Sequence, residues 1–143
     1  MLQSMFRGVA VGQVMNRIPT TVPANISLQK LVDEYFLPYG LHTAFVTQGD
    51  QLVGMITLSD IRHVPREQWG QAPVGSVMIP LELLHAVSPQ QNLNDVLPLM
   101  ANRDVNQLPV LQDGKLFGVL TRDAIIRTLE IRCGLGLDED RAA

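Results

Sequence analysis

The chain is poor in cysteine, in aromatic residues and in positive charge. Its 143 residues include a single cysteine, Cys133, so no internal disulfide can form, and a lone thiol is typical of a reducing compartment. Aromatic residues make up 5% of the chain and hydrophobic residues 46%, so the core must be mainly aliphatic. Eleven Lys and Arg against 14 Asp and Glu give a net charge of −3, which excludes the basic footprint of a nucleic-acid binder.

Further absences narrow the class of protein. No apolar run is long enough to cross a bilayer and no signal peptide opens the chain, so we expect a cytoplasmic domain. The three histidines, His42, His63 and His85, lie in different segments without the spacing of metal ligands. No Ser-His-Asp set is visible either. We therefore expect neither a metal site nor a catalytic centre in this chain.

The most informative pattern is an internal repeat. Residues 52–60 (LVGMITLSD) form an apolar stretch that leads into a helix start, and residues 116–124 (LFGVLTRDA) repeat it sixty-four positions later. Residues 11–15 (VGQVM) return as residues 74–78 (VGSVM), with four of five positions identical. A repeat of this length indicates duplicated supersecondary units, neither of which can bury its hydrophobic face alone.

Each repeat predicts the same order of elements, β-α-β-β-α. Short strands are expected around residues 21–22 and 85–87. Each is followed by a helix, capped by Ser27 or Asn92, whose apolar residues recur at i, i+3, i+4, i+7 and i+8. These apolar positions are Leu28, Leu31, Val32, Tyr35 and Phe36 in the first helix, and Leu93, Val96, Leu97, Met100 and Ala101 in the second.

A hairpin and a closing helix complete each repeat. The hairpins turn through residues 49–50 and 113–114, and Asp-Gly at the latter suits the positive φ angles of a type I′ turn. Closing helices are expected at residues 59–63 and 122–133.

Proline and glycine mark the expected ends and breaks of these elements. We expect Pro38 to end the first helix, Pro98 to kink the second helix and Gly134 to stop the last helix. Pro109 fits a strand end or a strand edge better than the middle of a strand.

The predicted fold class is α/β (α+β), with two β-α-β-β-α repeats packed around a pseudo-twofold axis. The first repeat covers residues 9–64 and the second covers residues 74–133. A polar linker, residues 65–73, joins them, and residues 134–143 form a mobile tail. Within the linker, Trp69 is expected to hold the segment on the body of the protein, with contact to a partner as the alternative.

The two strand-to-helix corners are candidate ligand sites, and the expected packing places them near one shared cleft. Thr57 and Asp60 could offer a hydroxyl and helix N–H groups to a phosphate, and a carboxylate to ribose hydroxyls. The same Thr-x-x-Asp spacing is a capping box, in which Thr57 accepts from the N3 amide and Asp60 reaches back. Both interpretations fit the residues, and the two roles can coexist.

With these features the chain resembles a tandem pair of cystathionine-beta-synthase (CBS) domains, called a Bateman module, over roughly residues 9–132. The resemblance rests on the Val-Met before each repeat, the Leu-Pro-Val at residues 108–110, and the Gly-x-x-Thr corners at residues 54–57 and 118–121. It implies a regulatory module and not an enzyme. It also implies an adenosine-containing ligand, such as AMP, ADP or ATP, in the cleft between the repeats, with no other cofactor required.

The family's corner contacts phosphate through its hydroxyl and ribose through its carboxylate. Thr57 and Asp60 match this corner in full, whereas the second corner has Thr121 followed by Ala124 where an acid is expected. Ribose recognition is therefore expected mainly at the first corner. Arg122 could meet a phosphate with two hydrogen bonds, or it could be a solvated residue at a helix start. The nucleotide contacts expected from the resemblance are Thr57, Asp60, Thr121, Arg122, Ile18, Thr20, Ala44 and Phe45.

A narrower resemblance concerns residues 57–69. They are similar to the linker of CBS pairs that follow the membrane part of site-2-protease-like zinc metallopeptidases. This implies an upstream membrane metallopeptidase and a place on the cytoplasmic face of the membrane, although the chain itself has no His-Glu-x-x-His motif. We also expect a homodimer. The alternative function is a ligand-free dimerisation or docking module, in which both corners are only helix caps.

Overall fold

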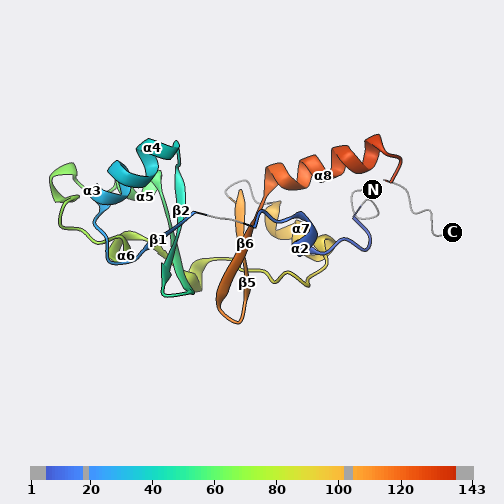
Figure 1. Ribbon diagram of the computed structural model, residues 1–143, viewed down its shortest axis with the longest axis horizontal. Helices are drawn as coiled ribbons and strands as arrows, with labels where there is room; N and C mark the ends of the chain where they lie inside the picture. The colour runs from blue at the N-terminus through green and yellow to red at the C-terminus, as the bar shows by residue number, and fades with distance from the viewer. Residues whose placement is uncertain (1–5, 18–19, 102–104, 138–143) are drawn as a thin grey trace. The chain divides into compact units, whose positions relative to one another are not determined.

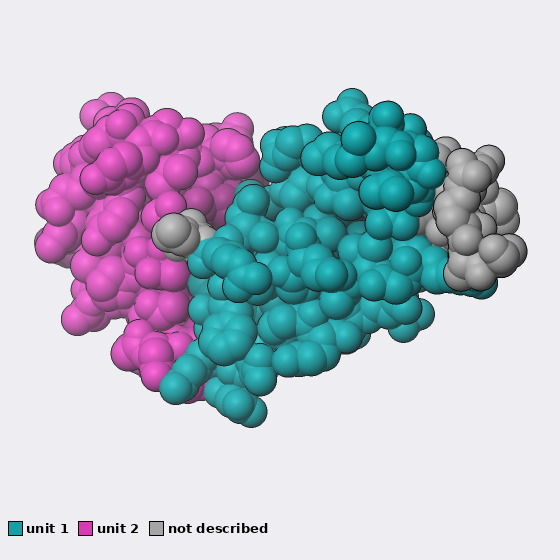
Figure 2. Space-filling view, turned by 45° about the vertical axis from the view of Figure 1, so that its right-hand side comes forward, with its two compact units in different colours: residues 1–18, 85–143 teal, residues 19–84 magenta. Residues whose placement is uncertain are grey.

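The computed structural model describes residues 6–17, 20–101 and 105–137 (Figure 1). The chain forms two compact units, which Figure 2 shows in different colours. Unit 1 consists of Met1–Ile18 together with His85–Ala143, and unit 2 is Pro19–Leu84. Each unit combines a β-hairpin with helices, so the predicted mixed α/β class is confirmed. Among the described residues, no helix is both long enough and apolar enough to span a membrane.

Unit 2 is built around the β2–β3 hairpin. Parallel to β2 runs β1, while β3 and β4 both pair in antiparallel fashion with their neighbours. Three consecutive helical segments, α3, η1 and α4, lead from β1 to β2, and α5 follows β3 directly. The bounds are β1 (Thr21–Pro23), α3 (Leu28–Leu31), η1 (Val32–Phe36), α4 (Leu37–Tyr39), β2 (Thr43–Gln48), β3 (Gln51–Thr57), α5 (Leu58–Arg62), η2 (Arg66–Gln68), α6 (Val74–Val77), β4 (Ile79–Pro80) and η3 (Leu81–Leu83).

Unit 1 is built around the β5–β6 hairpin in the same way. The hairpin is antiparallel, and Val87 forms a parallel bridge to β5, which is all that remains of the strand expected around residues 85–87. The long helix α8 follows β6 directly, as α5 follows β3. The bounds are α2 (Val11–Val14), α7 (Leu93–Met100), β5 (Gln107–Gln112), β6 (Lys115–Thr121) and α8 (Arg122–Gly134).

The two hairpins repeat each other residue by residue. Thr43 pairs with Thr57 in one, and Gln107 pairs with Thr121 in the other, each sixty-four positions further on. Both hairpins also have a register shift between the fourth and fifth residues of their first strand. The predicted duplication therefore extends to the irregularities of the backbone.

The glycine of each Gly-x-x-Thr corner lies under a crossing segment of chain. A β-carbon added at Gly54 would lie 2.5 Å from the carbonyl oxygen of Ile79 and 2.6 Å from the sulfur of Met78. At Gly118 an added β-carbon would meet the carbonyl oxygen of Asn16 in the same way. Real β-carbons do not approach other atoms so closely, so the corner glycine is required for packing as well as being part of the repeat.

Each crossing segment, residues 11–15 or residues 74–78, belongs to the unit that is built mainly from the other repeat. Residues 11–15, which open the first repeat, belong to the unit built mainly from the second repeat. Residues 74–78, which open the second repeat, belong to the unit built from the first. The boundaries of the compact units therefore differ from those of the sequence repeats. Residues 9–64 and 74–133 describe the repetition in the sequence.

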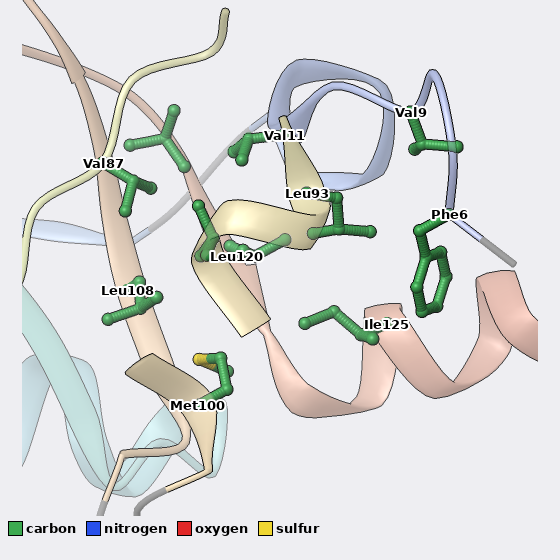
Figure 3. Packing of buried hydrophobic residues seen from close by; sticks show 11 residues of the cluster. Phe6, Val9, Val11, Val87, Leu93, Met100, Leu108, Leu120 and Ile125 are labelled. Carbon is green, nitrogen blue, oxygen red and sulfur yellow. The ribbon is translucent and has the colours of Figure 1, made fainter. Parts of the chain in front are cut away.

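The core of unit 1 combines aliphatic side chains with one aromatic ring, Phe6, which lies at one end of the cluster (Figure 3). Leu93, Val96 and Met100 of α7 are buried as the helical spacing predicted. Ala101 is exposed, so the prediction is wrong for this residue, because α7 ends at Met100. Phe6 is fully buried, although the residues around it have no periodic pattern.

The linker between the repeats is held on unit 2. The indole Nε1 of Trp69 donates to the carbonyl of Val64 at 3.0 Å, and the ring packs against the core of the unit. The carbonyls of Ala72 and Trp69 accept the N–H groups of Leu28 and Gln29. A helix lacks internal partners for these first-turn amides, so the linker caps α3. The expectation that Trp69 holds the linker on the body is confirmed.

Two predicted helix ends are wrong by a few residues. Pro38 does not end the first helix, which continues to Tyr39 and stops at Gly40, where φ is +62°. The widened π-helical turn of η1 comes just before Pro38, and it gives the proline ring room that an α-turn would not.

At the other end of the chain, Gly134 is the last residue of α8 and not its stop. The stop is Gly136, with φ of +73°. The N–H groups of Gly136 and Leu137 bond to the carbonyls of Cys133 and Arg132, which is a Schellman motif. Of the expected mobile tail, residues 134–137 thus belong to the helix end, and residues 138–143 lie outside the described residues.

Pro98 and Pro109 both lie inside elements, and the backbone contacts explain how β5 accommodates Pro109. Pro98 lies within α7, as predicted. Pro109 is the third residue of β5 and not at its end. Its equivalent, Phe45, sends its N–H away from the hairpin to the carbonyl of Thr20. The missing N–H of Pro109 therefore falls on the outer side of β5, where it removes no hydrogen bond from the hairpin.

Candidate functional site

Thr57 and Asp60 form a complete capping box at the start of α5. The Thr57 hydroxyl oxygen accepts the N–H of Asp60 at 3.3 Å. In return, the Oδ2 atom of Asp60 accepts the backbone N–H of Thr57 at 2.8 Å and the Thr57 hydroxyl at 3.0 Å. The capping interpretation is confirmed, and ligand contact remains a prediction.

The capping box uses only half of the Asp60 carboxylate. Within the described part of the chain, the hydrogen bonds to this side chain end on Oδ2 and none ends on Oδ1. The residue is half-buried. An ionised carboxylate offers about four acceptor positions, so Oδ1 could accept from two neighbouring hydroxyls while Oδ2 keeps the cap. The two proposed roles of Asp60 therefore do not compete for one oxygen.

Other predicted contacts of unit 2 lie close to this corner in the sheet. Thr43 pairs with Thr57, and Ala44 and Phe45 follow it along β2. The N–H of Phe45 donates to the carbonyl of Thr20 at 3.1 Å, which places Thr20 beside them. Thr20 is exposed, whereas Ala44 and Phe45 are buried. Of the three, Thr20 is the residue whose side chain is open to a ligand.

Sequence reasoning left His42 out of the predicted site residues. Its carbonyl accepts the N–H of Leu58 at 3.0 Å, and sixty-four positions on the carbonyl of Asn106 accepts the N–H of Arg122 at 3.1 Å. The exposed His42 ring lies with Nδ1 3.2 Å from the Thr43 hydroxyl. Backbone contacts leave no signal in residue type, but applying the repeat offset to both corners would have indicated this one.

The second corner is capped differently. The Thr121 hydroxyl oxygen accepts the N–H of Ala124 at 3.1 Å, and Ala124 has no carboxylate to reach back. The Thr121 hydroxyl proton is therefore not committed to a capping partner, whereas Thr57 donates its proton to Asp60. Thr121 could donate to a phosphate directly, but Thr57 would first have to release its bond to the carboxylate.

The Arg122 side chain lies against the segment before β5. Its Nη2 donates to the carbonyl of Val105 at 2.8 Å, and its Nε donates to the Asn106 side chain at 3.3 Å. Contact with a phosphate stays a prediction. Thr121 and Arg122 belong to unit 1 and the other described contacts to unit 2, while Ile18 lies outside the described residues.

The described residues contain no group of three or more His, Cys, Asp or Glu that could hold a metal ion. Cys133 is exposed on α8. The His63 ring lies 2.7 Å from the carbonyl of Ser59 on its own helix. The His63 contact thus lies at Ser59, between the two residues of the capping box.

Comparisons with known proteins match both repeats. The model of the CBS domain family matches residues 11–67 and 74–131. A Synechocystis protein named "Putative zinc metalloprotease sll0528" is 29% identical over 112 residues, which cover 76% of this chain and 30% of that protein. "Zinc metalloprotease MJ0392" of Methanocaldococcus jannaschii is 24% identical over 130 residues, covering 91% of this chain and 35% of that protein. The chain thus spans about a third of the length of these relatives.

A solved structure has the same fold. The crystal structure of the CBS-pair protein CBSX2 from Arabidopsis thaliana aligns with a TM-score of 0.75 and 25% identity, covering 88% of this chain and 98% of that one. A CBS pair is a regulatory and not a catalytic domain. Because the family model accounts for both repeats and for most of the residues between the termini, this chain belongs to the CBS domain family as a tandem pair.

Proposed function

We propose that this CBS pair is a regulatory module that binds an adenosine-containing ligand, such as AMP, ADP or ATP, at the Thr57–Asp60 corner. The observation that carries the proposal is the half-buried Asp60 carboxylate, whose Oδ2 is held by the cap and whose Oδ1 accepts no bond within the described residues. A fixed carboxylate with one open oxygen suits the paired hydroxyls of ribose. The exposed side chain of Thr20, whose carbonyl accepts the N–H of Phe45, offers a second polar group on the same sheet.

Regulation would follow from differential affinity for conformations of the protein. A ligand that contacts both Asp60 and Thr20 joins the start of α5 to the segment before β1. It therefore favours conformations in which these segments lie close together, and it shifts the population toward them. A ligand that binds all conformations equally would shift nothing, however tight its binding.

We propose that the regulated protein is an attached zinc metallopeptidase at the cytoplasmic face of a membrane. The similarity to zinc metalloproteases three times longer than the matched region supports this proposal. Sequencing the gene upstream of Met1 tests it. We expect an open frame that encodes apolar membrane segments and a His-Glu-x-x-His motif, and a stop codon directly before Met1 would contradict it.

We propose further that the module forms homodimers. Large apolar side chains are exposed on both units, with Leu37 and Tyr39 of α4 at 72% and 71% and Leu135 after α8 at 68%. Light scattering should give twice the mass of the chain. A mass of one chain at high protein concentration would overturn the dimer.

The competing function is a ligand-free docking module, which the complete capping box at Thr57 and the missing acid at Ala124 favour. A thermal-shift screen with AMP, ADP, ATP and S-adenosylmethionine separates the two functions. A ligand that binds only the folded state raises the melting temperature by mass action. We expect at least one adenosine compound to do so and inorganic phosphate not to. If none of them raises the melting temperature at millimolar concentration, the docking function is favoured.

A further inference from the structure

A cavity of about 210 Å³ lies between α2 and α8 in unit 1. Protein cavities of about 150 Å³ hold a benzene ring, and sites for drug-sized ligands measure roughly 300–1,000 Å³. This cavity therefore has room for a small ligand of about eight non-hydrogen atoms. Its lining residues are Val9, Gln13, Val14, Thr128, Ile131 and Arg132.

Arg132 lines this cavity and carries an unsatisfied donor. Its Nε is buried and has no hydrogen-bond partner among the described residues. The guanidinium is held in place by its Nη2, which donates to the carbonyl of Leu137 at 3.1 Å. A buried donor without an acceptor is costly, and more so when it is charged. An anion inside the cavity would lie beside this guanidinium and offset the cost through its charge.

The other polar side chains of the cavity leave a second donor. The Thr128 hydroxyl donates to the carbonyl of Ala124 at 2.9 Å, so its proton is already used. The Gln13 side-chain oxygen accepts the N–H of Ala10 at 2.8 Å, which leaves its amide nitrogen as a donor. The two donors, on Arg132 and Gln13, both suit an acceptor that carries negative charge.

The rest of the wall is aliphatic. Val9 is buried at 8% exposure, Val14 is half-buried, and Ile131 lies at the mouth with 58% exposure. Such a surface favours a hydrocarbon body over a polar one, by roughly 25 cal/mol for each Å² of apolar area removed from water. The cavity thus combines one cationic end with an apolar wall.

We propose that this cavity binds a small aliphatic monocarboxylate, with its carboxylate on Arg132 and its hydrocarbon body against Val9, Val14 and Ile131. The site uses none of the residues of the Thr57–Asp60 corner, so it stands independently of the proposed nucleotide binding. Acidic side chains at residues 138–140 of the same chain carry the same charged group. They lack the hydrocarbon body that the wall favours, so we assign the site to a free ligand.

The probe for this site is 4-methylpentanoate, which has eight non-hydrogen atoms. Calorimetric titration of the whole chain should show saturable binding. Two matched compounds separate the contributions: 4-methylpentan-1-ol has the body without the charge, and acetate has the charge without the body. Each should bind at least about tenfold more weakly than the probe. If acetate or the alcohol binds as tightly as the probe, the proposed recognition is wrong.

Substitutions on α8 locate the bound probe. Ile131→Glu places a negative charge at the mouth, whereas Ile126→Glu places it at a similarly exposed position, 48%, that does not line the cavity. Ile131→Glu should weaken binding at least about tenfold and Ile126→Glu should leave it unchanged. Arg132→Met should also weaken it, with Arg127→Met as the control. Melting curves show whether each variant is folded, and equal affinity in Ile131→Glu and the native chain overturns the site.

A final variant of the full chain distinguishes the two sources of carboxylate. It combines Asp138→Asn, Glu139→Gln and Asp140→Asn, which removes the acidic groups of the chain's end. Unchanged affinity for 4-methylpentanoate supports the assignment to a free ligand. An affinity more than about tenfold higher would show that the chain's own carboxylates occupy the cavity, and this would overturn the assignment.

Discussion

Asp60 combines two contributions that measurement can separate. Asp60→Ala removes the acid of the capping box, so the free energy of unfolding should fall by about 0.5–1 kcal/mol without ligand. If the proposed function is right, the same change should weaken nucleotide binding by about 1.5–3 kcal/mol, because a charged hydrogen-bond acceptor is lost. Denaturant unfolding measures the first effect and calorimetric titration measures the second.

A matched control for this variant is Asp123→Ala. Asp123 is also an acid in a first helical turn, but it is exposed and lies one position before the N3 residue Ala124. It should change both quantities by a few tenths of a kcal/mol at most. If Asp60→Ala lowers stability but leaves nucleotide affinity at the native value, the corner is a helix cap only.

Gly54 gives a second prediction at this scale. Gly54→Ala should lower the free energy of unfolding by about 1–3 kcal/mol, because the added methyl group would overlap the carbonyl oxygen of Ile79. Gly70→Ala is the control, since Gly70 has open space around it. It should be neutral or stabilising by up to about 1 kcal/mol. Urea unfolding of both variants tests the difference, and equal losses would mean that close packing does not explain the glycine.

Single residues show how far the candidate site could be predicted. The cap at Thr57 and Asp60 follows from residue spacing alone, because a capping box is a local structure. Whether the cap uses one carboxylate oxygen of Asp60 or both depends on side-chain geometry, which the sequence pattern does not encode. The burial of Phe6 could not be predicted for a related reason. A single aromatic residue has no periodicity, and the core that buries it comes from distant parts of the chain.

At the scale of the elements, helix α7 contains a proline, Pro98, in its interior. Pro98 has no N–H for the carbonyl of Asn94, and such a proline inside a helix costs about 3 kcal/mol. Pro98→Ala should therefore raise the free energy of unfolding by about 1–3 kcal/mol, after allowing for the greater freedom of the unfolded chain. Pro38→Ala should give a smaller gain, because η1 widens the turn before it. Thermal and urea unfolding of both variants provide the test.

A gain at Pro38 as large as the one at Pro98 would contradict this account of η1.

The elements also show why helix and strand types were easier to predict than their ends. Apolar spacing and turn residues define a whole helix or hairpin, as Asp113 and Gly114 do with φ of +57° and +79°. A π-helical turn or the choice between Gly134 and Gly136 is decided by a few local contacts, which periodicity does not report.

For the whole molecule, the exchange of segments predicts which fragments can fold. A fragment of residues 19–84 contains every described element of unit 2, including α6 and β4. A fragment of similar length, residues 9–73, matches the first sequence repeat but lacks Met78 and Ile79, which cover Gly54. We expect the first fragment to unfold cooperatively and the second not to. Circular dichroism during heating tests this.

Cooperative unfolding of the fragment 9–73 would show that the crossing segment is dispensable.

The exchange of crossing segments between the repeats is also the part of the fold that the sequence repeat could not reveal. Self-similarity identifies two equivalent pieces of sequence, but not which piece packs against which. That choice depends on long-range contacts, and it became visible only where the crossing backbone excludes a side chain at Gly54 and Gly118.

The discontinuity of unit 1 also has a consequence for the order of events on the ribosome. Unit 2 is complete once Leu84 has been added, but the bridge from Asn16 must wait for Val119. At about 5–20 residues per second, the start of the chain remains without its partner strand for roughly 5–20 s. Phe6 and Val11 are apolar and fully buried in the finished protein, so a nascent chain displays them to chaperones and to neighbouring chains during that interval.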